Sequence, residues 1–182
     1  MIKEISIFLI VAVFSNQIFA VGKLATISKS ILIESSHSDV FDIVKNTMND
    51  YLWRSEVNHM SSNGEFEIGT IYTEDAHIGF AKNFITRTQL VELKSEDYAF
   101  YITPKDSPYY LESLRQVKRI DHNRTLFTYT VKFEASMSKA TIGISLPAKV
   151  LEKSYGVIMN KYLRSLRNHL EDGESFESLY KP

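Results

Sequence analysis

The side chains best suited to acid–base or metal chemistry are Glu74, Asp75 and His77, which lie within one short segment. Carboxylates and imidazoles are the groups that proteins use for proton transfer and for binding metals. Successive residues of a strand point to opposite faces, so Glu74 and Asp75 cannot line one pocket unless a turn intervenes. His59 and His77 could meet across neighbouring strands, but two histidines without a further ligand make a poor zinc site. We therefore expect a solvated turn here and predict no metal site.

Basic residues cluster later in the chain, at Arg115, Lys118 and Arg119, with Arg87 as a nearby member. Such a cluster can bind an anionic head group or a membrane surface, in a contact that would be transient. It can equally line the solvated outer face of a sheet, which is the interpretation we favour. The chain holds 21 Lys+Arg against 22 Asp+Glu, and its net charge of −1 gives no support to nucleic-acid binding.

Several classes of chemistry lack the residues that they require. The sequence has no cysteine, which excludes a disulfide framework, a thiol nucleophile and a cysteine-based zinc site. No glycine-rich phosphate loop and no Ser-His-Asp spacing stands out. We predict no cofactor and assign no catalytic residue. Asn123-Arg124-Thr125 fits the N-glycosylation pattern in an exposed predicted turn, which matters only in a eukaryotic secretory host.

The first twenty residues are typical of a secretory signal peptide. The segment from Ile5 to Phe14 is apolar except for Ser6, and a polar boundary and Ala20 follow it. The run of about ten residues is shorter than the ~20 that a membrane-spanning helix needs. An uncleaved anchor and the first strand of a cytosolic protein are the alternatives. We expect a secreted or periplasmic protein with a signal peptide at 1–20, one domain at 21–173 and a loose tail at 174–182.

The hydrophobic pattern then predicts a succession of strands between helices. β-branched residues predict a strand at 25–33, and serines followed by Asp39 and Asp42 predict a short helix. A second short helix or turn carries Tyr51, Leu52 and Trp53. Alternating residues predict six further strands, at 56–62, 68–76, 79–93, 97–104, 109–120 and 124–135. Pro147 opens a long helix over 148–170, whose apolar stripe comprises Leu151, Tyr155, Ile158, Tyr162, Leu166 and Leu170.

This order of elements predicts an α+β fold: a curved antiparallel six- or seven-stranded sheet wrapped around a long C-terminal helix, with two short helices after the first strand. The helix at 148–170, about 34 Å long, is the only element long enough to cover the apolar face of the sheet. A twisted sheet curls around such a helix, and the curvature can leave a ligand cavity between them. The aromatic residues, 12% of the chain, could line that cavity or fill a solid core.

Three segments and the order of elements carry a resemblance to a known family. The segments are Asp39-Val40-Phe41-Asp42-Ile43-Val44 with Trp53 soon after it, Asn123-Arg124-Thr125-Leu126-Phe127-Thr128-Tyr129, and the end of the final helix from Tyr162 to Glu171. With them the chain resembles the helix-grip superfamily, which includes the START-type lipid-transfer domains, the birch-pollen allergens and the polyketide cyclase/dehydrase-like proteins, often called SRPBCC. The resemblance covers about 25–171 and implies an apolar or amphipathic ligand between sheet and helix. It implies no shared catalytic residue.

Three functions remain open on this basis. The first is binding of a hydrophobic or amphipathic small molecule or lipid, with transport of that molecule as an extension. The residues that would line its site are Trp53, Phe84, Phe100, Tyr110, Phe127, Tyr129, Phe133, Tyr155, Ile158 and Tyr162. The second is a cyclase- or dehydrase-type enzyme, for which His59, Asp75 or a tyrosine hydroxyl would have to act inside the cavity. The third is a protein-interaction domain with a filled core.

Overall fold

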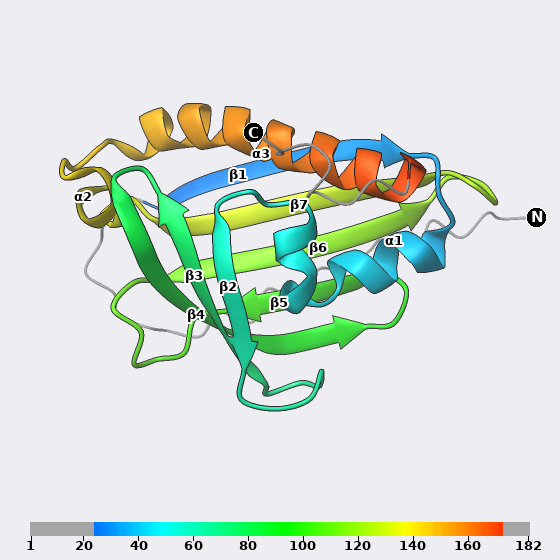
Figure 1. Cartoon of the computed structure of the whole chain (residues 1–182), viewed down its shortest axis with the longest axis horizontal. Helices are drawn as coiled ribbons and strands as arrows, with labels where there is room; N and C mark the ends of the chain where they lie inside the picture. The colour runs from blue at the N-terminus through cyan, green and yellow to red at the C-terminus, as the bar shows by residue number, and fades with distance from the viewer. Residues whose placement is uncertain (1–23, 173–182) are drawn as a thin grey trace, which may run out of the picture.

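The computed structural model describes residues 24–172; the predicted signal peptide and the predicted tail at 174–182 lie outside these residues. The elements are β1 (Leu24–Ile33), α1 (His37–Val44), the 3-10 helix η1 (Thr47–Leu52), β2 (Val57–Ser62), β3 (Ile71–Ile78), β4 (Ala81–Lys94), β5 (Tyr98–Ile102), β6 (Leu111–Arg119), β7 (Thr125–Glu134), α2 (Met137–Ile142) and α3 (Ala148–Asp172). Figure 1 shows a curved sheet with α3 lying along it. This is the predicted α+β architecture.

The seven strands form one antiparallel sheet in the order β1-β7-β6-β5-β4-β3-β2. β7 shows why the sheet has an inner and an outer face, because its buried residues alternate strictly with partly exposed ones. Phe127, Tyr129, Val131 and Phe133 face inward, towards α3, and each contributes roughly 1.5–3 kcal/mol by burial. Thr128 and Thr130 face outward and pair with serines of β1. Below, the inner face is the one towards α3.

The buried stripe of α3 consists of Met159, Tyr162, Leu163 and Leu166, spaced three or four residues apart. The prediction that Ile158 belongs to this stripe is wrong, because Ile158 is 43% exposed and Met159 is fully buried in its place. α3 packs chiefly along β1, at one edge of the sheet (Figure 1). The helix therefore rests on one side of the sheet, while β2, β3 and β4 form the other side.

Local side-chain caps position the segment between β1 and β2. The Ser36 side chain accepts a hydrogen bond from the backbone N–H of Asp39 and so caps α1, as predicted. Asn46 caps η1 in the same way through the N–H of Met48. η1 is the predicted second short helix. The backbone carbonyl of Asp50 then accepts from the N–H groups of Trp53 and Arg54, which turns these two side chains towards the sheet.

Helix α2 was not predicted, because it is only six residues long and has no side-chain cap at its N-terminus. It ends at Gly143, whose φ of 80° suits glycine. α2 lies beside the turn between β3 and β4, where the N–H of Phe80 donates to the carbonyl of Thr141.

Two apolar clusters fill the interior of the described chain. The larger one joins α1 and α3 to β1, β6 and β7. The smaller one lies on the β2–β5 side and contains Met60, Tyr72, Leu90, Ala99 and Tyr101. Within residues 24–172, no helix combines the length and the hydropathy that a membrane span requires.

Candidate functional site

A buried ion pair between Asp50 and Arg115 forms the centre of the site. Nη1 of Arg115 lies 2.6 Å from Oδ1 of Asp50, and Nη2 lies 2.7 Å from Oδ2. Arg115 Nη1 also donates to the carbonyl of Val44 at 3.1 Å. Asp50 is 0% exposed and Arg115 is 1% exposed, so this pair is shielded from water. Buried charges are tolerated only when they are paired and hydrogen-bonded in this way.

Arg54 extends this pair into a cluster with two more carboxylates. Its Nη1 donates to Asp50 Oδ2 and to Glu74 Oε2, both at 2.8 Å. Its Nη2 donates to Glu74 Oε1 at 2.8 Å, and its Nε donates to Glu56 Oε1 at 3.0 Å. Asp50, Arg54, Glu56, Glu74 and Arg115 are called the ionic cluster below. It joins η1, β3, β6 and the segment after η1.

The strand pattern explains how the sheet supplies Arg115 and Glu74 to the ionic cluster. Arg115 shares the inner face of β6 with Ser113 and Val117, all of them buried. Glu74 shares the inner face of β3 with Tyr72 and Ala76. Residues two apart on a strand point to the same side, so each charged side chain must enter the interior with its apolar neighbours.

Aromatic rings surround the two guanidinium groups. The Arg115 guanidinium lies 5.4 Å from the ring centre of Tyr101, 5.5 Å from that of Tyr129 and 5.8 Å from that of Trp53. Arg54 lies 5.7 Å from the ring centre of Tyr162. A cation over an aromatic face is stabilised by the charge distribution of the ring, most strongly where water is excluded.

These surroundings shift several proton affinities. Burial lowers the pKa of Arg54 and of Arg115, but the nearby carboxylates outweigh it and hold both pKa values above the ordinary one. Burial raises the pKa of the Tyr129 hydroxyl, and it raises that of Tyr155 well above the ordinary value. The pKa of Tyr162 is raised as well, first by burial and then by Tyr155 and Glu56. Both arginines are thus charged and these tyrosines neutral at ordinary pH.

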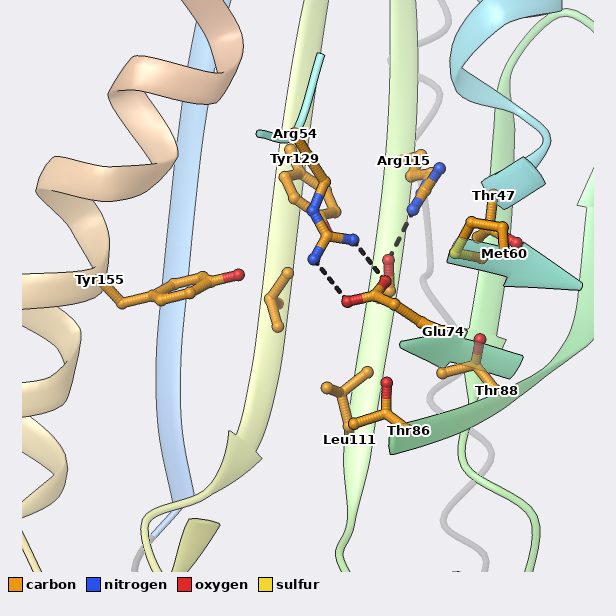
Figure 2. A pocket seen from close by; sticks show the side chains of 12 residues that line it. Thr47, Arg54, Met60, Glu74, Thr86, Thr88, Leu111, Arg115, Tyr129 and Tyr155 are labelled. Carbon is orange, nitrogen blue, oxygen red and sulfur yellow. Dashed lines mark hydrogen bonds and ion pairs between the residues drawn. The ribbon is translucent and has the colours of Figure 1, made fainter. Parts of the chain in front are cut away.

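A narrow recess of about 50 Å³ lies beside the ionic cluster (Figure 2). Its lining residues are Thr47, Arg54, Met60, Glu74, Thr86, Thr88, Leu111, Ser113, Arg115, Tyr129, Val131 and Tyr155. Figure 2 shows Tyr155 reaching from α3 towards Arg54 and Glu74, which point at one another. Met60 belongs to the smaller apolar cluster and Tyr129 to the larger one, so the recess lies between the two.

One lining group has no hydrogen-bond partner in the structure. Thr47 is 5% exposed, and its Oγ1 is buried without a donor or acceptor nearby. A buried hydroxyl left unpaired costs on the order of 1–3 kcal/mol. The recess therefore contains a polar atom that a bound group could satisfy.

The recess is much smaller than a typical small-molecule site of about 300–1,000 Å³, so it falls short of the ligand cavity that the sequence predicts between the sheet and the C-terminal helix. A volume of about 50 Å³ has room for roughly three water molecules. The physical reason is that the aromatic rings pack against one another. The Phe133 and Tyr155 ring centres lie 5.7 Å apart, and those of Tyr155 and Tyr162 lie 6.3 Å apart.

The structure brings most of the predicted ligand residues to the inner face. Tyr129 and Tyr155 line the recess. Trp53 and Tyr162 do not line it but contact two lining residues, Tyr129 and Arg54 respectively. Phe84, Phe127 and Phe133 belong to the same apolar cluster.

Three predicted ligand residues lie elsewhere. Phe100 faces outward on β5, between the buried Ala99 and Tyr101. Tyr110 precedes β6 and donates to Glu112, which pairs with Lys132 on the outer face. Ile158 is exposed on α3.

Several charged residues and histidines that were candidates for chemistry also lie in other places than predicted. The expected solvated turn is wrong for Glu74, which is a largely buried strand residue bound to Arg54. The solvated outer face is wrong for Arg115, because it is buried, although Lys118 and Arg119 are exposed. Asp75 bonds to Asn58 and Asn83 rather than to the ionic cluster, as strand alternation requires. His59 and His77 are exposed and do not line the recess. Arg87 forms an ion pair with Asp106.

Four members of the site were not predicted from the sequence: Asp50, Arg54, Glu56 and Thr47. A signal was present in the first two, because Asp50 and Arg54 are opposite charges four residues apart on either side of Trp53.

No family model and no curated protein sequence matches this chain. Its fold, however, is similar to solved structures. A START superfamily protein from Mycobacterium smegmatis matches with a TM-score of 0.66 and 14% identity, over 82% of this chain and 99% of that one. The ginseng (Panax ginseng) major latex-like protein 151 matches at 0.59 and 13%, over 81% and 97%. The di-domain ARO/CYC protein StfQ of the steffimycin biosynthetic pathway matches at 0.63 and 11%, over 82% of this chain and 51% of that one.

Proposed function

We propose that this chain, a protein of the helix-grip fold, binds an amphipathic small molecule between the inner face of its sheet and α3. The polar end of the molecule would occupy the recess beside the ionic cluster, and its apolar part would lie along the aromatic side chains of the interior. The observation that carries the proposal is the recess itself. It places charged groups and an unpaired hydroxyl between two apolar clusters.

The chemistry of the interior supports an amphipathic molecule over a purely apolar one. A hydrocarbon would leave the Thr47 hydroxyl unpaired, whereas a polar group could bond to it. A purely polar molecule would gain nothing from Tyr129, Val131 and Leu111 in the same lining. Small-molecule sites commonly combine apolar walls with a few polar groups that fix orientation.

The recess holds only the polar end of such a molecule, so the rest requires the interior to open. α3 packs chiefly along β1, at the far edge of the sheet from β2, β3 and β4. Movement of β2–β4 away from α3 would expose the inner face without breaking the contact between α3 and β1. Binding would therefore select an open state of the sheet edge, and the affinity would be lowered by the free energy of opening.

A pair of substitutions on one strand tests this proposal. Thr86→Phe places a ring in the recess, and Ile85→Phe places the same ring on the outer face, where Ile85 is 50% exposed. The probe is an environment-sensitive apolar dye, displaced by an alkyl alcohol such as decanol. We expect the dye and decanol to bind the unmodified protein and Ile85→Phe equally, and Thr86→Phe at least tenfold more weakly. Equal binding by all three proteins, each shown to be folded by circular dichroism, would overturn the proposal.

A second candidate function is catalysis on a similar molecule. The observation in its favour is the position of the Tyr155 hydroxyl beside the Arg54–Glu74 pair (Figure 2). The likeness to StfQ, an ARO/CYC protein, is consistent with it. Mass spectrometry of a molecule that copurifies with the protein separates the two functions. A bound compound that is released unchanged after prolonged incubation favours binding, and conversion to a product of different mass favours catalysis.

A further inference from the structure

The ionic cluster carries one excess negative charge. Asp50, Glu56 and Glu74 are three carboxylates, and Arg54 and Arg115 are the two cations that pair with them. The ion pairs that the structure gives these three carboxylates, among the described residues, are all with Arg54 or Arg115. The side chains of Glu56 and Glu74 are only 11% and 14% exposed, so water screens this excess charge weakly.

Nearly all hydrogen-bond donors of the two arginines are already engaged. Arg54 donates through Nε, Nη1 and Nη2 to carboxylates, and its Nη2 also lies 3.0 Å from Glu56 Oε1. Arg115 directs Nη1 to Asp50 and Val44, Nη2 to Asp50 and Nε to Ser113 at 3.5 Å, which leaves one N–H of Nη2 without an acceptor among the described residues. An anionic group entering the recess would find one guanidinium N–H available, but it would meet an excess of negative charge. The two arginines therefore do not make the recess an anion site.

The lining of the recess contains one unsatisfied oxygen, Oγ1 of Thr47, which is buried and has no partner. Glu74, a carboxylate of the ionic cluster, lines the recess as well. Tyr129 and Tyr155 add aromatic rings to the lining. An unpaired hydroxyl oxygen, excess negative charge and aromatic rings together suit a cation that carries N–H donors.

We infer that the recess binds the ammonium group of a cationic amphiphile, and this inference rests on the proposed function. An ammonium offers three N–H donors and one positive charge in a small volume, which matches both the unpaired oxygen of Thr47 and the excess charge. A group of that size fits within about 50 Å³. The bound cation would bring the charge of the ionic cluster to neutrality.

Three ligands of equal chain length test the inference: decylammonium, decanol and decanoate. Their affinities are measured by calorimetry below their micelle concentrations, on the whole chain at neutral pH. We expect decylammonium to bind about tenfold more tightly than decanol, as one charge-assisted contact predicts, and decanoate to bind most weakly. Decanoate or decanol binding as tightly as decylammonium would overturn the inference and leave the proposed function standing. Failure of all three to bind would overturn the proposed function as well.

Variants then locate the preference within the molecule. Glu74→Gln should abolish the advantage of decylammonium over decanol while decanol still binds. Glu112→Gln is the matched control, because Glu112 pairs with Lys132 on the outer face. It should leave the preference unchanged. If Glu74→Gln fails to fold, Thr47→Val provides the same comparison by removing the unpaired hydroxyl, and it should reduce the advantage at least threefold. A preference unchanged in the folded recess variant, or lost equally in Glu112→Gln, would contradict the assignment.

Discussion

Arg115 holds both carboxylate oxygens of Asp50 in a bidentate ion pair, although the two residues are 65 positions apart in the sequence. The pair links η1 to β6 in the middle of the sheet. It also fixes the geometry of the recess, because Arg54, which binds Asp50 from the other side, lines the recess together with Arg115.

Replacing Asp50 by Asn should destabilise the protein by about 3–5 kcal/mol, because it leaves the buried Arg115 without its counter-charge. Urea unfolding followed by Trp53 fluorescence measures the change, since Trp53 is the only tryptophan. Asp106→Asn is the control, because Asp106 pairs with Arg87 on the surface and should matter little. If both substitutions lower the free energy of unfolding by similar amounts, the buried ion pair stabilises the protein no more than the surface pair does.

Gly79→Ala should destabilise the protein more than Gly143→Ala. Both glycines have positive φ, 62° and 80°. A Cβ on Gly79 would lie 2.7 Å from the carbonyl oxygen of Thr141 and 2.4 Å from Cγ2 of Ile142, whereas nothing lies within 4 Å of a Cβ on Gly143. We expect Gly143→Ala to lower the free energy of unfolding by about 1 kcal/mol, from backbone strain alone. Gly79→Ala should lower it by about 1–3 kcal/mol more, because its Cβ also overlaps these atoms. Equal melting temperatures for the two variants would contradict this packing of α2 against the β3–β4 turn.

Thr47→Val should leave stability unchanged or raise it by up to about 1 kcal/mol, because it removes a buried hydroxyl that has no partner. Thr125→Val should have the opposite effect on stability. Thr125 is fully buried, and its hydroxyl donates to the carbonyl of Ser35, so its loss should cost about 1 kcal/mol. Thermal unfolding of both variants without ligand provides the comparison, and a clear loss of stability in Thr47→Val would mean that its hydroxyl is satisfied.

Folding stability should fall above pH 10. Burial raises the pKa of Tyr129, Tyr155 and Tyr162 above the ordinary value of 10.0, so the folded protein retains these protons where the unfolded chain releases them. Their contribution is thus fully present below pH 10 and is lost as the pH rises towards their folded pKa values. Phenolate absorbance and circular dichroism, recorded together, measure this. The buried tyrosines should ionise only as the protein unfolds, and their ionisation in a folded protein would contradict the burial.

The fold was predictable because its signals are repeated along the chain. Alternation in β7 and the apolar stripe of α3 each involve several residues, so one misplaced residue, Ile158, did not change the result. α2 was missed because it has only six residues and no side-chain cap at its N-terminus. The likeness to solved structures confirms the helix-grip fold that the sequence resemblance implied.

The candidate site was predicted only in its aromatic part. Arg115 was assigned to a solvated face by its charge, although its position two residues from Val117 indicated the inner face. Glu74 has the same relation to Tyr72 and Ala76. Which charges meet inside depends on contacts between residues far apart in the sequence, such as Asp50 and Arg115, and local patterns do not contain these contacts.

The most direct test of binding between the sheet and α3 is an NMR measurement of the protein with saturating decanol. Intermolecular nuclear Overhauser effects should connect the alkyl chain to Thr86, Tyr129 and Tyr155, which line the recess. Contacts confined to the outer-face residues Ile85 and Thr128, or no contacts at saturation, would contradict the account.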